Sequence, residues 1–188
     1  MSSVSGAAPR KAKAEKLATY FSASTKPTVE NAITQIKKSK FGKTKSGKFV
    51  IDKIVRLRKA GKIVIADTTD ASGNRLRGKW DYATGILTID TKMAGHVNDI
   101  ASELIHEAAH ALLSAQYVRT GRKPDGNSIE QETLTNGYQL QLYREQRKYR
   151  KDKDFELERR LKESNKGMLR QNIRTRYVTA PESQPKSK

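Results

Sequence analysis

Two histidines and a glutamate lie within five residues, His106-Glu107-Ala108-Ala109-His110. Residues four apart lie on one face of a helix, so His106 and His110 can bind the same metal ion. Glu107, between them, is then placed to act as general base on a water activated by that metal. Two of the chain's three histidines belong to this segment. The spacing therefore predicts a zinc-dependent hydrolase with one catalytic Zn2+, most simply a peptidase.

A catalytic zinc ion usually has three protein ligands and one open position. The chain contains no cysteine, so neither thiolate ligands nor disulfides are available. We interpret the remaining histidine, His96, as a loop residue near a helix start. The third ligand is then expected to be a carboxylate, and two candidates, Glu130 and Glu132, follow on the next predicted helix.

Several elements must position these residues, and their pattern predicts an α+β fold. The helix that carries both histidines is predicted over residues 99–117, where apolar side chains recur at helical spacing. A connector rich in Lys, Gly and Ser is expected over 41–48. Other helices are expected at 27–42, at 49–60 (where β-branched residues leave a strand open) and from Ser128 through Tyr143 into the charged run 144–166. Strands are expected at 62–67, 75–82 and 86–90.

The order of these elements resembles a gluzincin, a zinc peptidase whose third ligand is a glutamate on a second helix. The segment Glu132-Thr133-Leu134-Thr135-Asn136-Gly137-Tyr138-Gln139 resembles the E-x-x-A-N-x-F-A pattern of small ImmA/IrrE-type metallopeptidases, although Thr135 and Gln139 replace its two alanines. The resemblance covers roughly residues 60–145. It implies a minimal zincin-like domain, in which a short antiparallel or mixed sheet packs on the active-site helix and the third-ligand helix follows.

The same resemblance assigns the third ligand to Glu132, with Asn136 one helical turn later to orient its carboxylate. Glu130 has the spacing of thermolysin-like enzymes and remains the alternative. Strand 86–90 resembles the zincin edge strand that pairs with extended substrates, so substrate contacts are expected at Ile86, Leu87 and Thr88.

Hydrolysis would proceed through a water whose proton Glu107 accepts and passes to the leaving amine. A donor is also needed for the oxyanion that develops on the substrate. The sequence offers Tyr82, Tyr117, Tyr138 or an arginine for this role. Trp80 and Tyr82 are otherwise interpreted as packing residues.

Basic residues are concentrated at both ends of the chain, whose net charge is +18. Residues 1–48 carry +9 and residues 144–188 carry +8, whereas residues 103–143 carry −2. We expect a basic disordered leader (1–26), the zincin-like domain (27–166, core about 60–145, charged helical extension 144–166) and a basic disordered tail (167–188). The charged run can equally be a solvated helix with pairs such as Glu156–Arg160 and Arg159–Glu163.

The resulting functional hypothesis is a peptidase acting on protein or peptide substrates. Small domains with this motif resemble metallopeptidase toxins and effectors, and the basic leader suits a delivery apparatus. The alternative is a nucleic-acid-binding protein, or a peptidase tethered to nucleic acid or to an anionic surface by its flanks. With no transmembrane segment and no secretory signal, the chain is expected to be cytoplasmic as synthesised, and secretion or injection would need another route.

Overall fold

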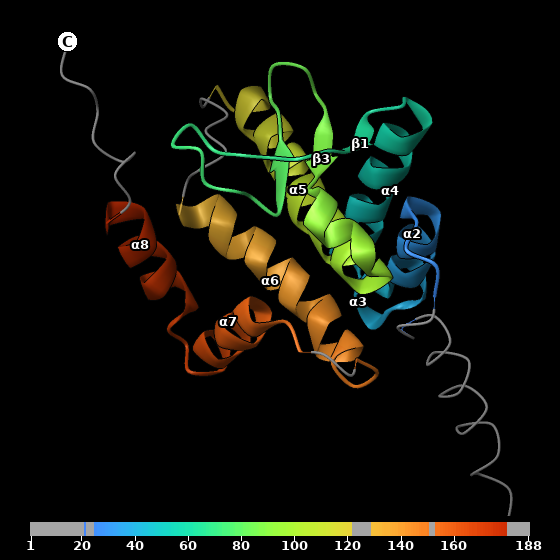
Figure 1. Ribbon diagram of the computed structural model, residues 1–188. Helices are drawn as coiled ribbons and strands as arrows, with labels where there is room; N and C mark the ends of the chain where they lie inside the picture. The colour runs from blue at the N-terminus through green and yellow to red at the C-terminus, as the bar shows by residue number, and fades with distance from the viewer. Residues whose placement is uncertain (1–20, 22–24, 122–128, 151–152, 180–188) are drawn as a thin grey trace, which may run out of the picture.

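The computed structural model describes residues 21, 25–121, 129–150 and 153–179. The fold is mixed α+β, with a three-stranded sheet packed against the long helices α4 and α5 (Figure 1). No helix in these ranges is long and apolar enough to cross a membrane. The elements are α2 (Val29–Lys38), α3 (Lys40–Lys43), α4 (Lys45–Lys59), β1 (Ile63–Ile65), β2 (Gly78–Trp80), β3 (Leu87–Ile89), the 3-10 helix η1 (Thr91–Gly95), α5 (Val97–Arg119), α6 (Ile129–Gln146), α7 (Phe155–Asn165) and α8 (Leu169–Thr179).

Helix α5, which carries both motif histidines, is the central element of the fold. It is two residues longer at each end than predicted, and most of its side chains are buried, polar ones included. It packs against α2 and α4 on one side and α6 on another (Figure 1). Gly121 follows the helix end with φ of 71°, a left-handed conformation that commonly ends a helix. The motif therefore lies in a largely buried part of the molecule.

The sheet has the order β1-β3-β2, so β3 is its central strand. Leu87 pairs with Ile63 of β1 in parallel and with Trp80 of β2 in antiparallel orientation. The expectation that Ile86–Thr88 form a substrate-binding edge is therefore wrong, because both backbone edges of β3 are already paired. Leu87 and Ile89 are buried in the core instead. The edge strand that packs against α5 is β2.

The predicted helix over 27–42 is two helices, because the chain leaves the helical conformation at Ser39. Thr28 caps α2, and its Oγ1 accepts a hydrogen bond from the Asn31 N–H at 3.1 Å. Ser39 ends α2 and caps α3, accepting from the Gly42 N–H at 3.0 Å. Ser39 is thus both the C-cap of α2 and the N-cap of α3.

The connector expected over 41–48 is wrong, because residues from Lys45 onward already belong to α4. Thr44 caps this helix and accepts a hydrogen bond from the Gly47 N–H at 2.9 Å. A Cβ on Gly47 would lie 1.9 Å from the Phe41 carbonyl oxygen, so the chain passes too closely there for any side chain. The Ser, Thr and Gly residues in this segment are therefore helix caps and close contacts.

The charged C-terminal part differs from the prediction in two ways. Helix α6 stops at Gln146, and α7 starts afresh after Asp154, whose carboxylate accepts from the Leu157 N–H at 2.9 Å. Residues 169–179, expected to be disordered, form α8. These helices share a second apolar cluster composed of Leu140, Tyr143, Leu157, Leu161, Leu169 and Ile173.

Phe21, expected in the disordered leader, is a fully buried member of the main core. Its ring stacks on Tyr149 with centroids 5.4 Å apart. The rest of the leader up to residue 24, the Ser128 cap and the tail beyond residue 179 lie outside the described residues.

Candidate metal centre

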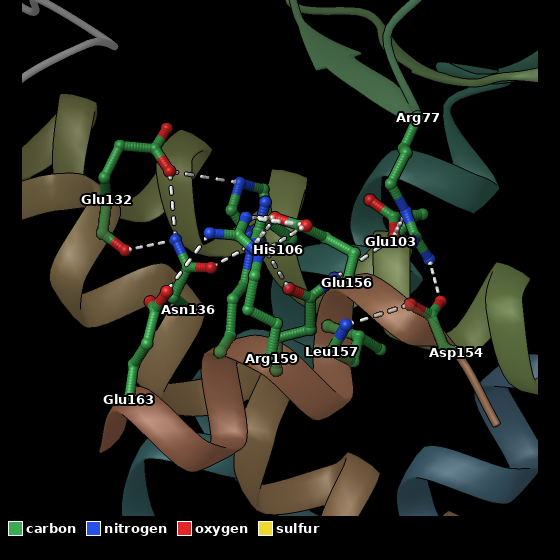
Figure 2. A network of polar contacts seen from close by, with 12 residues as sticks. Arg77, Glu103, His106, Glu132, Asn136, Asp154, Glu156, Leu157, Arg159 and Glu163 are labelled. Carbon is green, nitrogen blue, oxygen red and sulfur yellow. Dashed lines mark hydrogen bonds and ion pairs between the residues drawn. The ribbon is translucent and has the colours of Figure 1, made fainter. Parts of the chain in front are cut away.

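Helices α5 and α6 bring His106, His110 and Glu132 together. The Nε2 atoms of the two histidines are 3.2 Å apart, and the Glu132 carboxylate lies 3.0 Å from His110 Nε2. The same carboxylate lies 3.6 Å from His106 Nε2 (Figure 2). All three ligand atoms are within 4.8 Å of one another. Two imidazoles and a carboxylate converging in this way could hold a metal ion.

The alternative third ligand, Glu130, lies away from this cluster. It is exposed, and its Oε2 is 3.4 Å from the Tyr117 hydroxyl. His96 also lies apart from the cluster. It is the exposed N-cap residue of α5, which agrees with its interpretation as a residue near a helix start. Among the described residues, the geometry selects Glu132 over both.

The two imidazoles have different polar surroundings. His110 Nδ1 lies 3.4 Å from the buried Gln131 Oε1, an arrangement in which Nδ1–H donates and Nε2 carries the free lone pair. Within the described part of the chain, His106 Nδ1 is buried with no hydrogen-bond partner. A cation that accepts a lone pair from each Nε2 fits this pair better than a hydrogen bond between them.

Burial sets the charge state of His106. Desolvation lowers the pKa of His106 to about 3, and the nearby Glu132 charge offsets only part of that effect. Burial alone would also lower the pKa of His110, but the hydrogen bond and charge of Glu132 outweigh it and raise that pKa. His106 is thus neutral at pH 7, the state in which an imidazole binds a metal.

Asn136 lies where the resemblance placed it, one turn after Glu132. Its Nδ2 donates to Glu132 Oε2 at 3.1 Å and to the Glu132 backbone oxygen at 2.7 Å (Figure 2). The amide therefore holds both ends of the glutamate. Its other end accepts from Arg160, a residue of α7 that the sequence did not connect with the site.

Glu107 is 6 % exposed and faces strand β2. A Cβ on Gly78 would come within 3.2 Å of both Cγ and Oε1 of Glu107, so the strand backbone lies directly against the carboxylate. Burial raises the pKa of Glu107 to about 8, with smaller contributions from the charges of Glu103 and Glu132. A bound cation beside this carboxylate would favour its ionised form and so make it a base.

A cavity of about 920 Å³ opens onto the cluster. Its wall includes Tyr82, Arg77 and Arg160, three of the candidate donors for a substrate oxyanion. Tyr138 instead packs on the Phe41 ring at 5.7 Å, and Tyr117 is not in the cavity wall.

Trp80, interpreted as a packing residue, is half-buried against the core, with Lys53 Nζ 5.1 Å from its ring centroid. It also lines the cavity. Tyr82 contacts Trp80 edge to face at 6.4 Å but is 37 % exposed, so the packing interpretation describes it only in part.

Sequence reasoning missed the residues that support the cluster from other helices. The Glu156–Arg160 and Arg159–Glu163 pairs are present at 2.8 and 3.1 Å, as expected of a charged helix. Nothing local indicates that Arg160 also reaches Asn136 on α6. Glu103 could have been placed near the site from the sequence, because it lies one turn before Glu107 on the same helix.

Comparisons of this chain with protein-family models, with curated proteins and with solved structures found no match. The function of the site is therefore inferred from its own residues and their geometry.

Proposed function

We propose that the protein is a zinc metallopeptidase with His106, His110 and Glu132 as ligands. The observation that carries the proposal is the spacing of the ligand atoms, 3.0, 3.2 and 3.6 Å. Ligands 2.0–2.1 Å from a tetrahedral zinc ion are about 3.3 Å apart, so this cluster matches the edges of such a site. Three protein ligands leave a fourth position open, as catalytic zinc requires.

When bound here, zinc would lower the pKa of a water molecule and polarise the scissile carbonyl. Glu107 lies beside the ligands on the same helix and lines the same cavity. It would accept the proton from the attacking water and pass it to the leaving amine. Because this carboxylate is buried, bulk water is kept away from it, and the proton would pass from the attacking water to the leaving amine without exchange with solvent.

Strand β2 takes over the substrate-binding role first expected of β3. Gly78, Lys79 and Trp80 line the cavity, and among the described strands the side of β2 away from β3 is unpaired. An extended peptide could form backbone hydrogen bonds along this edge, and its scissile bond would then lie over the metal cluster. The edge next to the catalytic helix favours peptides over small-molecule substrates.

The alternative function, nucleic-acid binding through the charged run, is less well supported. Its arginines are largely engaged in ion pairs, among them Arg147–Glu158 at 3.0 Å and Arg150–Asp99 at 2.8 Å. Cations paired in this way have less to gain from phosphate contacts. Delivery as a toxin or effector remains part of the peptidase proposal and rests on the basic leader and on the family resemblance.

The test is metal analysis combined with proteolysis. Purified protein should contain one zinc per chain, and Glu107→Gln should keep the zinc but lose cleavage of a denatured protein substrate such as casein. His110→Ala should lose both. Wild-type protein without stoichiometric zinc, or undiminished cleavage by Glu107→Gln, would overturn the proposal.

A further inference from the structure

Helix α7 supports the metal cluster through one side chain, Arg160. Its Nε donates to Glu156 Oε1 at 2.8 Å, one turn earlier on the same helix. Its Nη1 donates to Asn136 Oδ1 and, more weakly, to Gln139 Oε1 at 3.4 Å, both on α6. The Arg160 side chain is 22 % exposed and lies in the wall of the cavity, so its contacts are partly buried and adjoin the metal cluster.

The contact with Arg160 fixes which way the Asn136 amide faces. An asparagine side chain has an acceptor end and a donor end, whereas a guanidinium only donates. Oδ1 must therefore face Arg160, and Nδ2 must face Glu132, to which it donates at 3.1 Å. Without the guanidinium, Oδ1 would lose this charged donor, and the amide would be held only by its two hydrogen bonds to Glu132.

The start of α7 is fixed to the rest of the site as well. Asp154, its N-cap residue, binds Arg77 Nη2 at 2.7 Å, and Arg77 Nε binds the buried Glu103 of α5 at 2.8 Å (Figure 2). Gln139 of α6 donates to the same Glu103 oxygen at 3.1 Å. These contacts connect α5, α6 and α7, so the position of Arg160 relative to the cluster is held from two sides.

We propose that Arg160 is a positioning residue, which holds Asn136 and through it Glu132 in the orientation that binds the metal. In this view α7 is part of the metal centre, although it contributes no ligand. The inference rests on the zinc site proposed above and adds a dependence on a helix about 30 residues further along the chain. Supporting hydrogen bonds of this kind typically change metal affinity about 10- to 100-fold when removed.

The experiment measures zinc affinity by competition with a fluorescent chelator, on full-length protein. Arg160→Met should bind zinc about 10-fold or more weakly than wild type. The matched control is Arg159→Met, since Arg159 is the neighbouring arginine, pairs with Glu156 and Glu163, and has no contact with Asn136. This control should keep wild-type affinity, and circular dichroism and thermal unfolding of the metal-free proteins check that both variants fold.

Two further variants separate positioning from general destabilisation. Asn136→Ala should weaken zinc binding as Arg160→Met does, and the double variant should bind no more weakly than either single one, because both remove the same support. Arg160→Lys, which keeps the charge beside Glu156, should fold and have intermediate affinity. Additive losses, or equal losses in Arg160→Met and Arg159→Met, would contradict the inference.

The outcome also distinguishes the two proposals. If wild-type protein binds no zinc, the proposed function fails. If wild-type protein binds zinc and Arg160→Met binds it equally well, only the positioning role of Arg160 fails.

Discussion

The carboxylate of Glu107 on α5 lies directly against the backbone of Gly78 in β2. A Cβ there would also lie 3.2 Å from the Thr88 carbonyl oxygen in the neighbouring strand, so a side chain at Gly78 requires its neighbours to shift by a few tenths of an ångström. The contact places the general base of the proposed reaction against the strand along which a peptide would bind. A side chain at Gly78 would therefore disturb the base and the substrate edge together.

We accordingly expect Gly78→Ala to lower kcat at least about 10-fold, since a small misplacement of a reacting group is costly. Zinc content should be unchanged, because Gly78 touches no ligand. Gly95→Ala is the matched control, as a Cβ there would meet nothing within 4 Å. Peptidase kinetics and metal analysis check both variants, and full activity of Gly78→Ala would argue against a general base at Glu107.

At the level of elements, Asp90 joins the end of β3 to η1 and the loop before β2. Its carboxylate accepts from the backbone N–H groups of Thr68 and Lys92 and from Arg75 Nε at 2.9 Å. Burial alone would raise the pKa of Asp90, but the Arg75 and backbone hydrogen bonds outweigh it and lower that pKa to about 2. The charged form is therefore the one that the fold stabilises.

Because the folded pKa of Asp90 lies below its ordinary value of 3.8, its contribution is complete above pH 4. It is lost as the pH falls from about 4 towards 2, and its size is at most about 2 kcal/mol. Other carboxylates with lowered pKa values, such as Asp154 and Glu156, also contribute in this range, so urea unfolding should show a loss of stability in wild type that is smaller in Asp90→Asn. Asp52→Asn, at an exposed site on α4, should retain the wild-type slope.

Some elements could be predicted from sequence and others could not, for physical reasons. The histidine pair of α5 follows from helical spacing, which is local, whereas Glu132 was singled out from Glu130 by the resemblance of residues 132–139 to a known pattern. The position of β3 between two strands depends on pairing with residues 63–65 and 78–80, and no local pattern encodes it. The contact of Arg160 with Asn136 is likewise non-local. In α8, the apolar pair Leu169 and Ile173 was present, but the surrounding charge suggested disorder.

At the scale of the whole molecule, two apolar clusters meet along α6. The main core surrounds α5, and the second cluster attaches α7 and α8 to the other side of α6 (Figure 1). The proposed metal ligands lie on α5 and α6, between the two clusters. The docking of α7 on α6 should therefore affect the stability of the fold and the metal affinity together.

We expect Leu161→Ala to destabilise the protein by about 2–4 kcal/mol, as for other buried leucines. It should also weaken zinc binding, because it loosens the helix that carries Arg160. Phe155→Ala, on the same helix but 83 % exposed, should change neither. Chemical denaturation and zinc competition measure both effects. If Leu161→Ala is destabilised but binds zinc as tightly as wild type, the docking of α7 does not support the metal site.

The proposed function requires His106, His110 and Glu132 to bind one zinc ion. Anomalous diffraction at the zinc edge, from crystals of the zinc-loaded protein, tests it most directly. We expect a single strong peak about 2.0–2.2 Å from Nε2 of each histidine and from the Glu132 carboxylate. The absence of a peak at this position, or a peak bound by Glu130 or His96 in place of Glu132, would contradict it.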